Sequence, residues 1–187
     1  MAVSAESIAA AVKAAKGRGL PPVDKWNPPF CGDLDMRIAR DGTWFYLGTP
    51  IGRAPLVRLF STVLKREGDK YFLVTPVEKV GITVDDAPFL AVDFEVEDDG
   101  ADQKLTFFTS VGDQVTADSD HPIRVTEQNG EPAPYVEVRA GLEALIDRKS
   151  FFRLVDLGVT EKIDGEDQFG VWSSGTFFEI AKASDLA

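Results

Sequence analysis

The chain has 187 residues, of which 44% are apolar and 27% charged, the proportions of an ordinary globular protein with room for one large domain or two small ones. Its 31 acidic and 20 basic residues give a net charge of −11, which argues against a duplex nucleic-acid partner, because such binding depends on neutralising phosphates. With one cysteine and one histidine, the sequence excludes an intrachain disulfide and a structural zinc site, and it fits a reducing cytoplasm.

The first expected element is a short helix capped by Ser4, with Ile8 and Val12 on one face. That apolar face is thin, so we expect residues 1–22 to form a loosely docked or mobile arm. Two Pro-Pro pairs make residues 20–30 extended and stiff, and we expect their aromatic side chains to pack on the body of the protein. No uncharged apolar run reaches about 18 residues, so no membrane span is predicted.

Alternating apolar residues predict most of the remaining chain to be β-structure. Asp41-Gly42 and Asn129-Gly130 lie between such runs, and these dipeptides favour the type I′ hairpin turn, which needs positive φ at both central residues. In residues 90–97 the apolar side chains are expected to face inward and the acids between them to face solvent. The predicted β-segments are a hairpin at residues 36–47 and strands at 71–75, 79–84, 90–97, 105–110, 123–127, 135–139, 142–146, 169–173 and 176–180.

A helix is predicted between Pro55, which suits the first helical position, and Gly68, which suits the residue after the end. Apolar residues recur there at i, i+3, i+4, i+7 and i+8, which makes one stripe along a helix. The stripe consists of Leu56, Leu59, Phe60, Val63 and Leu64.

A repeat at a spacing of 95 residues relates the two halves of the chain, because residues 51–60 match residues 146–155 with four of ten positions identical. A repeat this long indicates a duplicated supersecondary unit. In this register Ser150 is the N-cap of a second helix, whose stripe is Phe151, Leu154, Val155 and Val159.

The repeat predicts an α+β fold of two duplicated strand-helix-strand halves with mostly antiparallel sheets. The N-terminal repeat is expected in residues 23–88 and the C-terminal repeat in residues 89–187.

The sequence has no recognisable catalytic motif, and only two residues are candidates for catalysis. The sequence contains no nucleophile elbow, phosphate-binding P-loop, dinucleotide fingerprint or zinc-protease motif. His121 lies beside Asp118 and Asp120 and could act as an acid or base, although Asp residues before a proline also form turns. Cys31 is open to two interpretations, a nucleophile paired with that histidine or a small buried apolar residue. A non-enzymatic protein is therefore favoured.

Arg53 and its repeat partner Arg148 lie just before a predicted helix, where the macrodipole disfavours a cation. A compensating anion is needed, either a carboxylate of the protein or a bound anion shared with the free N–H groups. Arg58 and Arg153 lie five residues later, and they serve the same anion or fix each helix to its sheet.

The runs KWNPPFCGDLDMRIARDGTWFYLGTPIGR, LVRLFSTVLKREGDKYFLVTPVEKVGI and RAGLEALIDRKSFFRLV resemble the bacterial domain-of-unknown-function family DUF1285, over roughly residues 23 to 182. The resemblance implies a duplicated core whose C-terminal half is pleckstrin-homology-like. It also implies a pocket between the halves, a nucleotide-based ligand and a role in signal transduction. It implies no catalytic residues.

The favoured hypothesis is a non-enzymatic binding or sensing protein of the bacterial cytoplasm that holds a small anionic ligand, nucleotide-based by the resemblance, in a cleft between the halves. Aromatic rings would stack on the ligand and guanidinium groups would bind its phosphate or carboxylate. The alternatives are a hydrolase using His121 and nearby acids, or an adaptor, so a protein partner is left open; no cofactor or metal is predicted. The candidate ligand-binding residues are Trp44, Tyr46, Arg53, Arg58, Lys79, Arg148 and Arg153.

Overall fold

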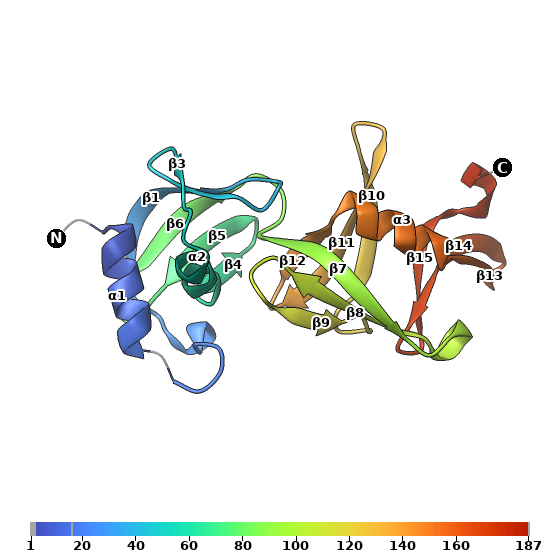
Figure 1. Cartoon of the computed structure of the whole chain (residues 1–187), viewed down its shortest axis with the longest axis horizontal. Coiled ribbons are helices and arrows are strands. Elements are labelled where there is room, and N and C mark those ends of the chain that lie inside the picture. The colour runs from blue at the N-terminus through green and yellow to red at the C-terminus, as the bar shows by residue number, and fades with distance from the viewer. Residues whose placement is uncertain (1–2, 16, 187) are drawn as a thin grey trace. The chain divides into compact units, whose positions relative to one another are not determined.

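A computed structural model of the chain describes residues 3–15 and 17–186 (Figure 1). Packing contacts divide the chain into two compact units, Met1–Pro88 (unit 1) and Phe89–Ala187 (unit 2). Both combine helices with mostly antiparallel sheets, so the α+β class is confirmed. Within residues 3–15 and 17–186, none of the helices has the length and apolar character that crossing a membrane requires.

Unit 1 consists of helices packed on one sheet. Its helices are α1 (Ala5–Ala15) and α2 (Ala54–Ser61), with a 3-10 turn at Val23–Lys25. Its strands are β1 (Phe30–Ile38), β2 (Trp44–Tyr46), β3 (Thr49–Pro50), β4 (Leu64–Glu67), β5 (Lys70–Val74) and β6 (Lys79–Val84).

Unit 2 contains a larger and a smaller sheet. The larger sheet consists of β7 (Phe89–Glu97), β8 (Lys104–Thr109), β9 (Gln114–Thr116), β10 (Ile123–Gln128), β11 (Glu131–Arg139) and β12 (Leu142–Ile146). It is followed by α3 (Arg148–Asp156) and the smaller sheet of β13 (Val159–Ile163), β14 (Glu166–Ser173) and β15 (Thr176–Lys182). Short 3-10 turns lie at Gly100–Asp102 and Ala183–Leu186.

The two six-stranded sheets have the same topology. The strand order is β3-β2-β1-β6-β5-β4 in unit 1 and β9-β8-β7-β12-β11-β10 in unit 2. Each sheet is thus two antiparallel three-stranded meanders joined through one central parallel pair, β1 with β6 and β7 with β12. By place in the sheet, β1 corresponds to β7 and β6 to β12. The duplication is structural, but it is not in the 95-residue register.

That register holds only for part of the predicted repeat. The helices α2 and α3 do fall on matched residues, and each is followed by an antiparallel strand pair, β4 with β5 and β13 with β14. However, α2 joins the two meanders of its sheet, whereas α3 follows the last strand of its sheet. The predicted match of the preceding strands is therefore wrong, because β3 is an edge strand and β12 is central.

Both helices end earlier than predicted, and α3 also begins earlier, at Arg148. Helix α2 ends at Ser61, where the hydroxyls of Ser61 and Thr62 each donate to a carbonyl three residues back at 2.6 Å. Leu64 instead begins β4, opposite Leu73, and it is buried there as it would have been on the helix. The pattern could not separate these outcomes, since an apolar residue can reach one core from either element. Val159 likewise begins β13 and is 42% exposed.

The N-terminal helix is firmly docked, so the prediction of a loosely docked or mobile arm is wrong. Ile8 and Val12 are 0% and 1% exposed, and α1 packs on α2. Ser4 caps the helix as predicted, since its Oγ accepts from Ser7 N at 3.1 Å while Ser7 Oγ accepts from Ser4 N. Small alanines between the larger residues let the helix approach closely, which explains why a thin apolar face suffices.

Strand β7 contains a β-bulge that reverses the predicted facing of its first half. Ala91 pairs with Thr109 but Asp93 pairs with Phe108, so Val92 is an extra residue in β7. One extra residue changes which side chains face the core. The buried residues are consequently Phe89, Ala91 and Phe94, and the predicted inward facing of Leu90 and Val92 is wrong. Val96, beyond the bulge, lies on the face of Phe94 as predicted but is 41% exposed.

The two predicted hairpins are present, with different turns. Asn129 and Gly130 have φ of 54° and 79° between the paired Gln128 and Glu131, as a type I′ turn requires. The Asp41-Gly42 loop is longer, because the last strand pair before it is Ile38 with Trp44. There only Gly42 has positive φ, so the type I′ prediction is wrong at this hairpin.

Matched leucine substitutions test how the two helices contribute to stability. Leu154 is 0% exposed, and we expect Leu154→Ala to lower the free energy of unfolding by about 2–5 kcal/mol. Leu59, its partner in the 95-residue register, is only half-buried, so Leu59→Ala should cost about 1 kcal/mol. Urea denaturation of both variants measures the difference, and equal losses would show that Leu59 is as much a core residue as Leu154.

Candidate functional site

The predicted aromatic residues hold the helices of unit 1 to the sheet. Trp44 is 2% exposed, and its ring stacks on Phe60 of α2 with centroids 6.3 Å apart. A ring buried in this way cannot stack on a ligand, so Trp44 is a core residue. Tyr46 is half-buried, and its hydroxyl accepts a hydrogen bond from Ala5 N at 3.3 Å. Both residues therefore act in docking α1 and α2.

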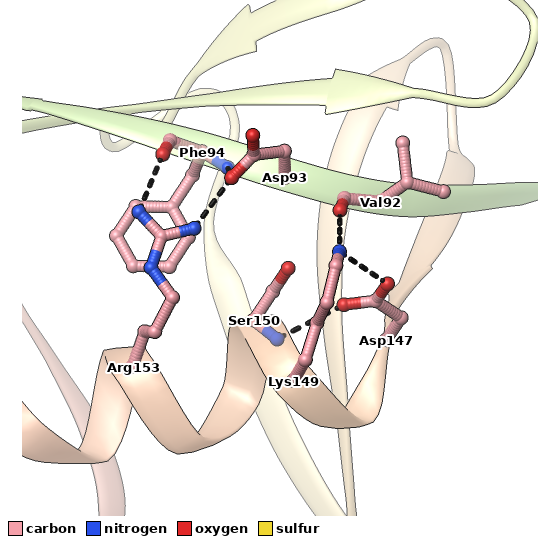
Figure 2. A network of polar contacts seen from close by, with 7 residues as sticks. All are labelled: Val92, Asp93, Phe94, Asp147, Lys149, Ser150 and Arg153. Carbon is pink, nitrogen blue, oxygen red and sulfur yellow. Dashed lines mark hydrogen bonds and ion pairs between the residues drawn. The ribbon is translucent and has the colours of Figure 1, made fainter.

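The start of α3 is neutralised by a carboxylate of the protein itself (Figure 2). Asp147, and not Ser150 as predicted, is the N-cap, and its Oδ1 accepts from Ser150 N at 3.0 Å. Lys149 bridges from Asp147 Oδ2, at 2.9 Å, to the carbonyl of Val92, which the β7 bulge frees from the strand ladder. Serine and aspartate are about equally favourable as N-cap residues, so the sequence alone could not decide between Asp147 and Ser150. The backbone geometry decides it.

Arg153 fixes α3 to β7. Its guanidinium donates to the carboxylate of Asp93 and, at 3.0 Å, to the carbonyl of Phe94 (Figure 2). It also lies over the Phe94 ring, 4.3 Å from the centroid. Of the two roles left open for this arginine, the contacts within unit 2 correspond to attaching the helix to its sheet.

The other predicted arginines are exposed. Arg148 lies over the ring of Phe152, 5.5 Å from its centroid, and Phe152 is itself 56% exposed. Arg53 is the N-cap residue of α2, with no side-chain cap bond. Pro55 removes one N–H group from the first turn of that helix, which weakens it as an anion site. Arg58 is exposed in the last turn.

A depression of about 580 Å³ lies on the sheet of unit 1, and Lys79 is the predicted candidate residue among those that line it. Asp33 of β1 and Phe72 of β5 both pair with Gly81 of β6, so the three residues form one row across the sheet. Gly81 has no side chain, which leaves the row hollow. A Cβ atom at Gly81 would lie 2.2 Å from Asp33 Oδ1, so this carboxylate lies directly over the glycine.

A bulge in β1 brings the lining residues to one face. Phe30 pairs with Lys79 and Asp33 with Gly81, so three steps along β1 match two steps along β6. The extra residue places Phe30 and Asp33 on the same face, although side chains three residues apart normally face opposite ways. Gly32 has φ of 97°, a backbone conformation that favours glycine.

This face is the one turned away from the helices. The side chains of Leu34, Met36 and Ile38 are buried on the opposite face, where Trp44 contacts α2. Asp33 and the exposed residues that alternate with this set therefore face solvent.

Charged groups of both signs line the depression. Lys79 Nζ lies 4.3 Å from the centroid of the Phe72 ring and donates to both oxygens of Glu67, at 2.8 and 2.7 Å. The hydrogen bond from Lys79 holds the pKa of Glu67 below its ordinary value, so the pair stays charged at neutral pH. Asp33 and Lys70 also line the depression, and neither forms an ion pair with the residues that the structure describes.

Aromatic surface is also available there. Phe30 is 58% exposed, and it contacts Phe72 edge to face with centroids 6.0 Å apart. The exposed ring thus provides an apolar surface at the border of the hollow.

The residues predicted as possible catalytic groups are His121, which is held in a turn by hydrogen bonds, and Cys31. Asp118 Oδ1 accepts from the backbone of Asp120 and His121 and lies 2.9 Å from His121 Nδ1, which is an Asx turn. Burial alone would raise the pKa of Asp118, but the hydrogen bonds from His121 outweigh it and lower the pKa. Cys31 is exposed, so the buried interpretation of this residue is wrong. Among residues 3–15 and 17–186, no group of His, Cys, Asp or Glu side chains could hold a metal ion.

Two family models together match most of the chain. One, described as "Domain of unknown function (DUF1285), N-terminal domain", matches residues 21–87. The other, described as "Protein of unknown function (DUF1285), C-terminal domain", matches residues 88–180. The chain belongs to the DUF1285 family. The boundary between the two DUF1285 models falls beside the division between unit 1 and unit 2.

Solved DUF1285 proteins are similar to the chain. A DUF1285 family protein from Silicibacter pomeroyi DSS-3 is 61% identical, with a TM-score of 0.88, over 96% of this chain and 97% of that one. A DUF1285 family protein from Shewanella baltica OS155 is 32% identical, with a TM-score of 0.52, over 65% of this chain and 90% of that one. No curated protein matches the chain.

Sequence reasoning found Lys79 but missed the rest of the depression in this DUF1285 chain. One signal was available, since Gly81 lies inside the predicted strand Lys79–Val84, and an interior glycine often marks a bulge or a hollow. Asp33 and Phe30 gave no such signal, because they reach this face only through the β1 bulge.

The cap of α3 generates a pH prediction. Burial alone would raise the pKa of Asp147, but hydrogen bonds from Ser150 and Lys149 outweigh it and lower the pKa below its usual 3.8. A lowered folded-state pKa means that the stabilisation is fully present above about pH 4 and is lost as the pH falls through the lower value. We expect Asp147→Asn, which keeps a capping oxygen but cannot titrate, to lose less stability than the wild type between pH 4 and 2.

Urea denaturation at each pH measures this effect. Asp156→Asn, at the exposed C-terminal end of α3, is the matched control and should keep the wild-type slope. Parallel curves for Asp147→Asn and the wild type would contradict the assignment of the cap.

Proposed function

We propose that the protein is a non-enzymatic small-molecule binding or sensing protein of bacterial signal transduction, and that unit 1 binds its ligand in the depression over Gly81. The observation that carries the proposal is this hollow of about 580 Å³ in the middle of an open sheet face, bordered by an exposed phenylalanine and by unpaired charges. The volume is within the range of small-molecule sites.

The ligand that fits this lining is a small anion with a flat ring, the class to which nucleotides belong. The Phe30 ring offers a surface for stacking, since more than half of it is exposed. Lys70 offers an unshared positive charge to a phosphate or carboxylate, and Lys79 adds a second charge that it shares with Glu67. Binding would thus combine stacking with charge pairing.

The lining favours binding over turnover. Ring stacking, ion pairing and hydrogen bonding hold a ligand, whereas nucleophilic catalysis needs a nucleophile within hydrogen-bond reach of a base. Among the described residues that line the depression there is no histidine, cysteine or serine. No observation favours the hydrolase alternative, because His121 is occupied in its turn with Asp118.

Three finer parts of the sequence-based hypothesis stay predictions. They are the cleft between the halves, the pleckstrin-homology-like character of the C-terminal half, and the cytoplasmic location. The residues assigned to that cleft were Trp44, Tyr46, Arg53, Arg58, Lys79, Arg148 and Arg153. A signalling partner is likewise part of the proposal.

A thermal-shift panel of nucleoside monophosphates, triphosphates and cyclic nucleotides tests the proposal on the full chain. A member present at 100 times its dissociation constant should raise the free energy of unfolding by about 2.7 kcal/mol. Gly81→Val fills the hollow, and we expect it to abolish this stabilisation. The variant should still fold, because Gly81 lacks positive φ and the Asp33 side chain that the valine displaces can rotate.

Gly52→Val is the matched control, because the space around Gly52 is open and it also lacks positive φ. It should keep the wild-type response. Stabilisation that survives in Gly81→Val would place the ligand elsewhere, and a panel without any stabilising member would overturn the nucleotide class.

A further inference from the structure

An anionic ligand does not explain the Asp33 carboxylate, which lies inside the depression, whereas the exposed Asp69 lies at its border. The Asp33 carboxylate lies over Gly81 at the floor of the hollow, and no hydrogen bond or ion pair joins it to any residue in the described part of the chain. An ionised carboxylate is an acceptor only, with two oxygens that can receive two parallel N–H groups. A ligand must therefore bring donors to this point or leave a negative charge beside its own.

Unit 2 shows what such a carboxylate binds. Strand β7 has the place in its sheet that β1 has in unit 1, and each strand has an exposed aspartate beside a bulge. The β1 bulge lies in the parallel ladder with β6, and the β7 bulge lies in the antiparallel ladder with β8, so the two aspartates are similar in setting and not in register. In unit 2 the aspartate is Asp93, and the planar guanidinium of Arg153 occupies it (Figure 2). That arginine comes from α3, which follows β12.

In unit 1 the match of this arginine in the 95-residue register, Arg58 of α2, does not pair with Asp33. Strand β6 corresponds to β12, but the described residues after it, 85–88, form no helix. The carboxylate of Asp33 is thus left open, whereas that of Asp93 is paired from within unit 2.

We propose, on the basis of the function proposed above, that Asp33 selects ligands that present two coplanar N–H donors. A guanidinium group has this chemistry, and so does the guanine edge, where the ring N1–H and the exocyclic amine lie side by side. Adenine lacks it, because its ring N1 is an acceptor and would face the carboxylate oxygen. With the ring against Phe30 and the phosphate at Lys70, a guanine nucleotide satisfies Asp33 and Lys70, while the exposed Asp69, which also lines the depression, stays in contact with solvent.

Isothermal titration of the full chain with guanosine, inosine and adenosine monophosphates tests the proposal. We expect the guanosine nucleotide to bind about tenfold or more tightly than the adenosine one, with the inosine nucleotide, which keeps only the ring N–H, in between. Asp33→Asn replaces one acceptor oxygen by a donor, and it should bring the three affinities within about threefold of one another.

Asp35→Asn is the matched control, because Asp35 is an exposed aspartate of the same strand that does not line the depression. It should keep the wild-type preference. Equal affinities in the wild type, or a preference that survives in Asp33→Asn, would overturn the proposal.

Free arginine is the second probe and separates this inference from the function on which it rests. If the nucleotides fail to bind but arginine binds and loses affinity at least tenfold in Asp33→Asn, the assignment of Asp33 stands and the nucleotide class fails. If neither probe binds the wild type, both proposals are overturned.

Discussion

The β-bulge of β1 at Gly32 is the constraint on which the candidate site of unit 1 depends. In a regular strand Phe30 and Asp33 would face opposite sides of the sheet, and one of them would enter the core under the helices. Burying the carboxylate without a partner would be costly, and burying the ring would remove the stacking surface. The extra residue places both on the open face, and the φ of 97° at Gly32 explains why a glycine stands there.

The same sheet topology is used differently in the two units. In unit 2 the helix after β12 lies against β7, so Asp93 and the freed carbonyl of Val92 are satisfied by Arg153 and Lys149. In unit 1 the helices pack on the other face of the sheet, and α2 enters between the meanders instead of after them. An internal ion pair in one unit therefore corresponds to an open carboxylate in the other.

Local patterns predicted most of the β-segments, because alternation and turn residues act within a few positions, as at Asn129-Gly130, but they missed β4, β9 and β13. They failed where one residue changes the register, as at Val92, and where two elements reach the same core, as at Leu64. The candidate site shows the same limit. Lys79 lies on a predicted strand, but the approach of Asp33 to Gly81 depends on pairing across the sheet, which no local pattern contains.

The net charge of −11 by itself disfavours an anionic ligand, but distant acids contribute little to the potential at the site. Exposed charges are screened over about 8 Å at physiological ionic strength, so the groups that line the depression decide. There Lys70, Asp33 and Asp69 are unpaired with described residues, while Lys79 and Glu67 neutralise each other. A simple anion would gain from Lys70 and lose to the two aspartates. A dipolar ligand, with donors at one end and an anionic group at the other, gains from Lys70 and from Asp33, so the ring edge should decide affinity more than the phosphate does.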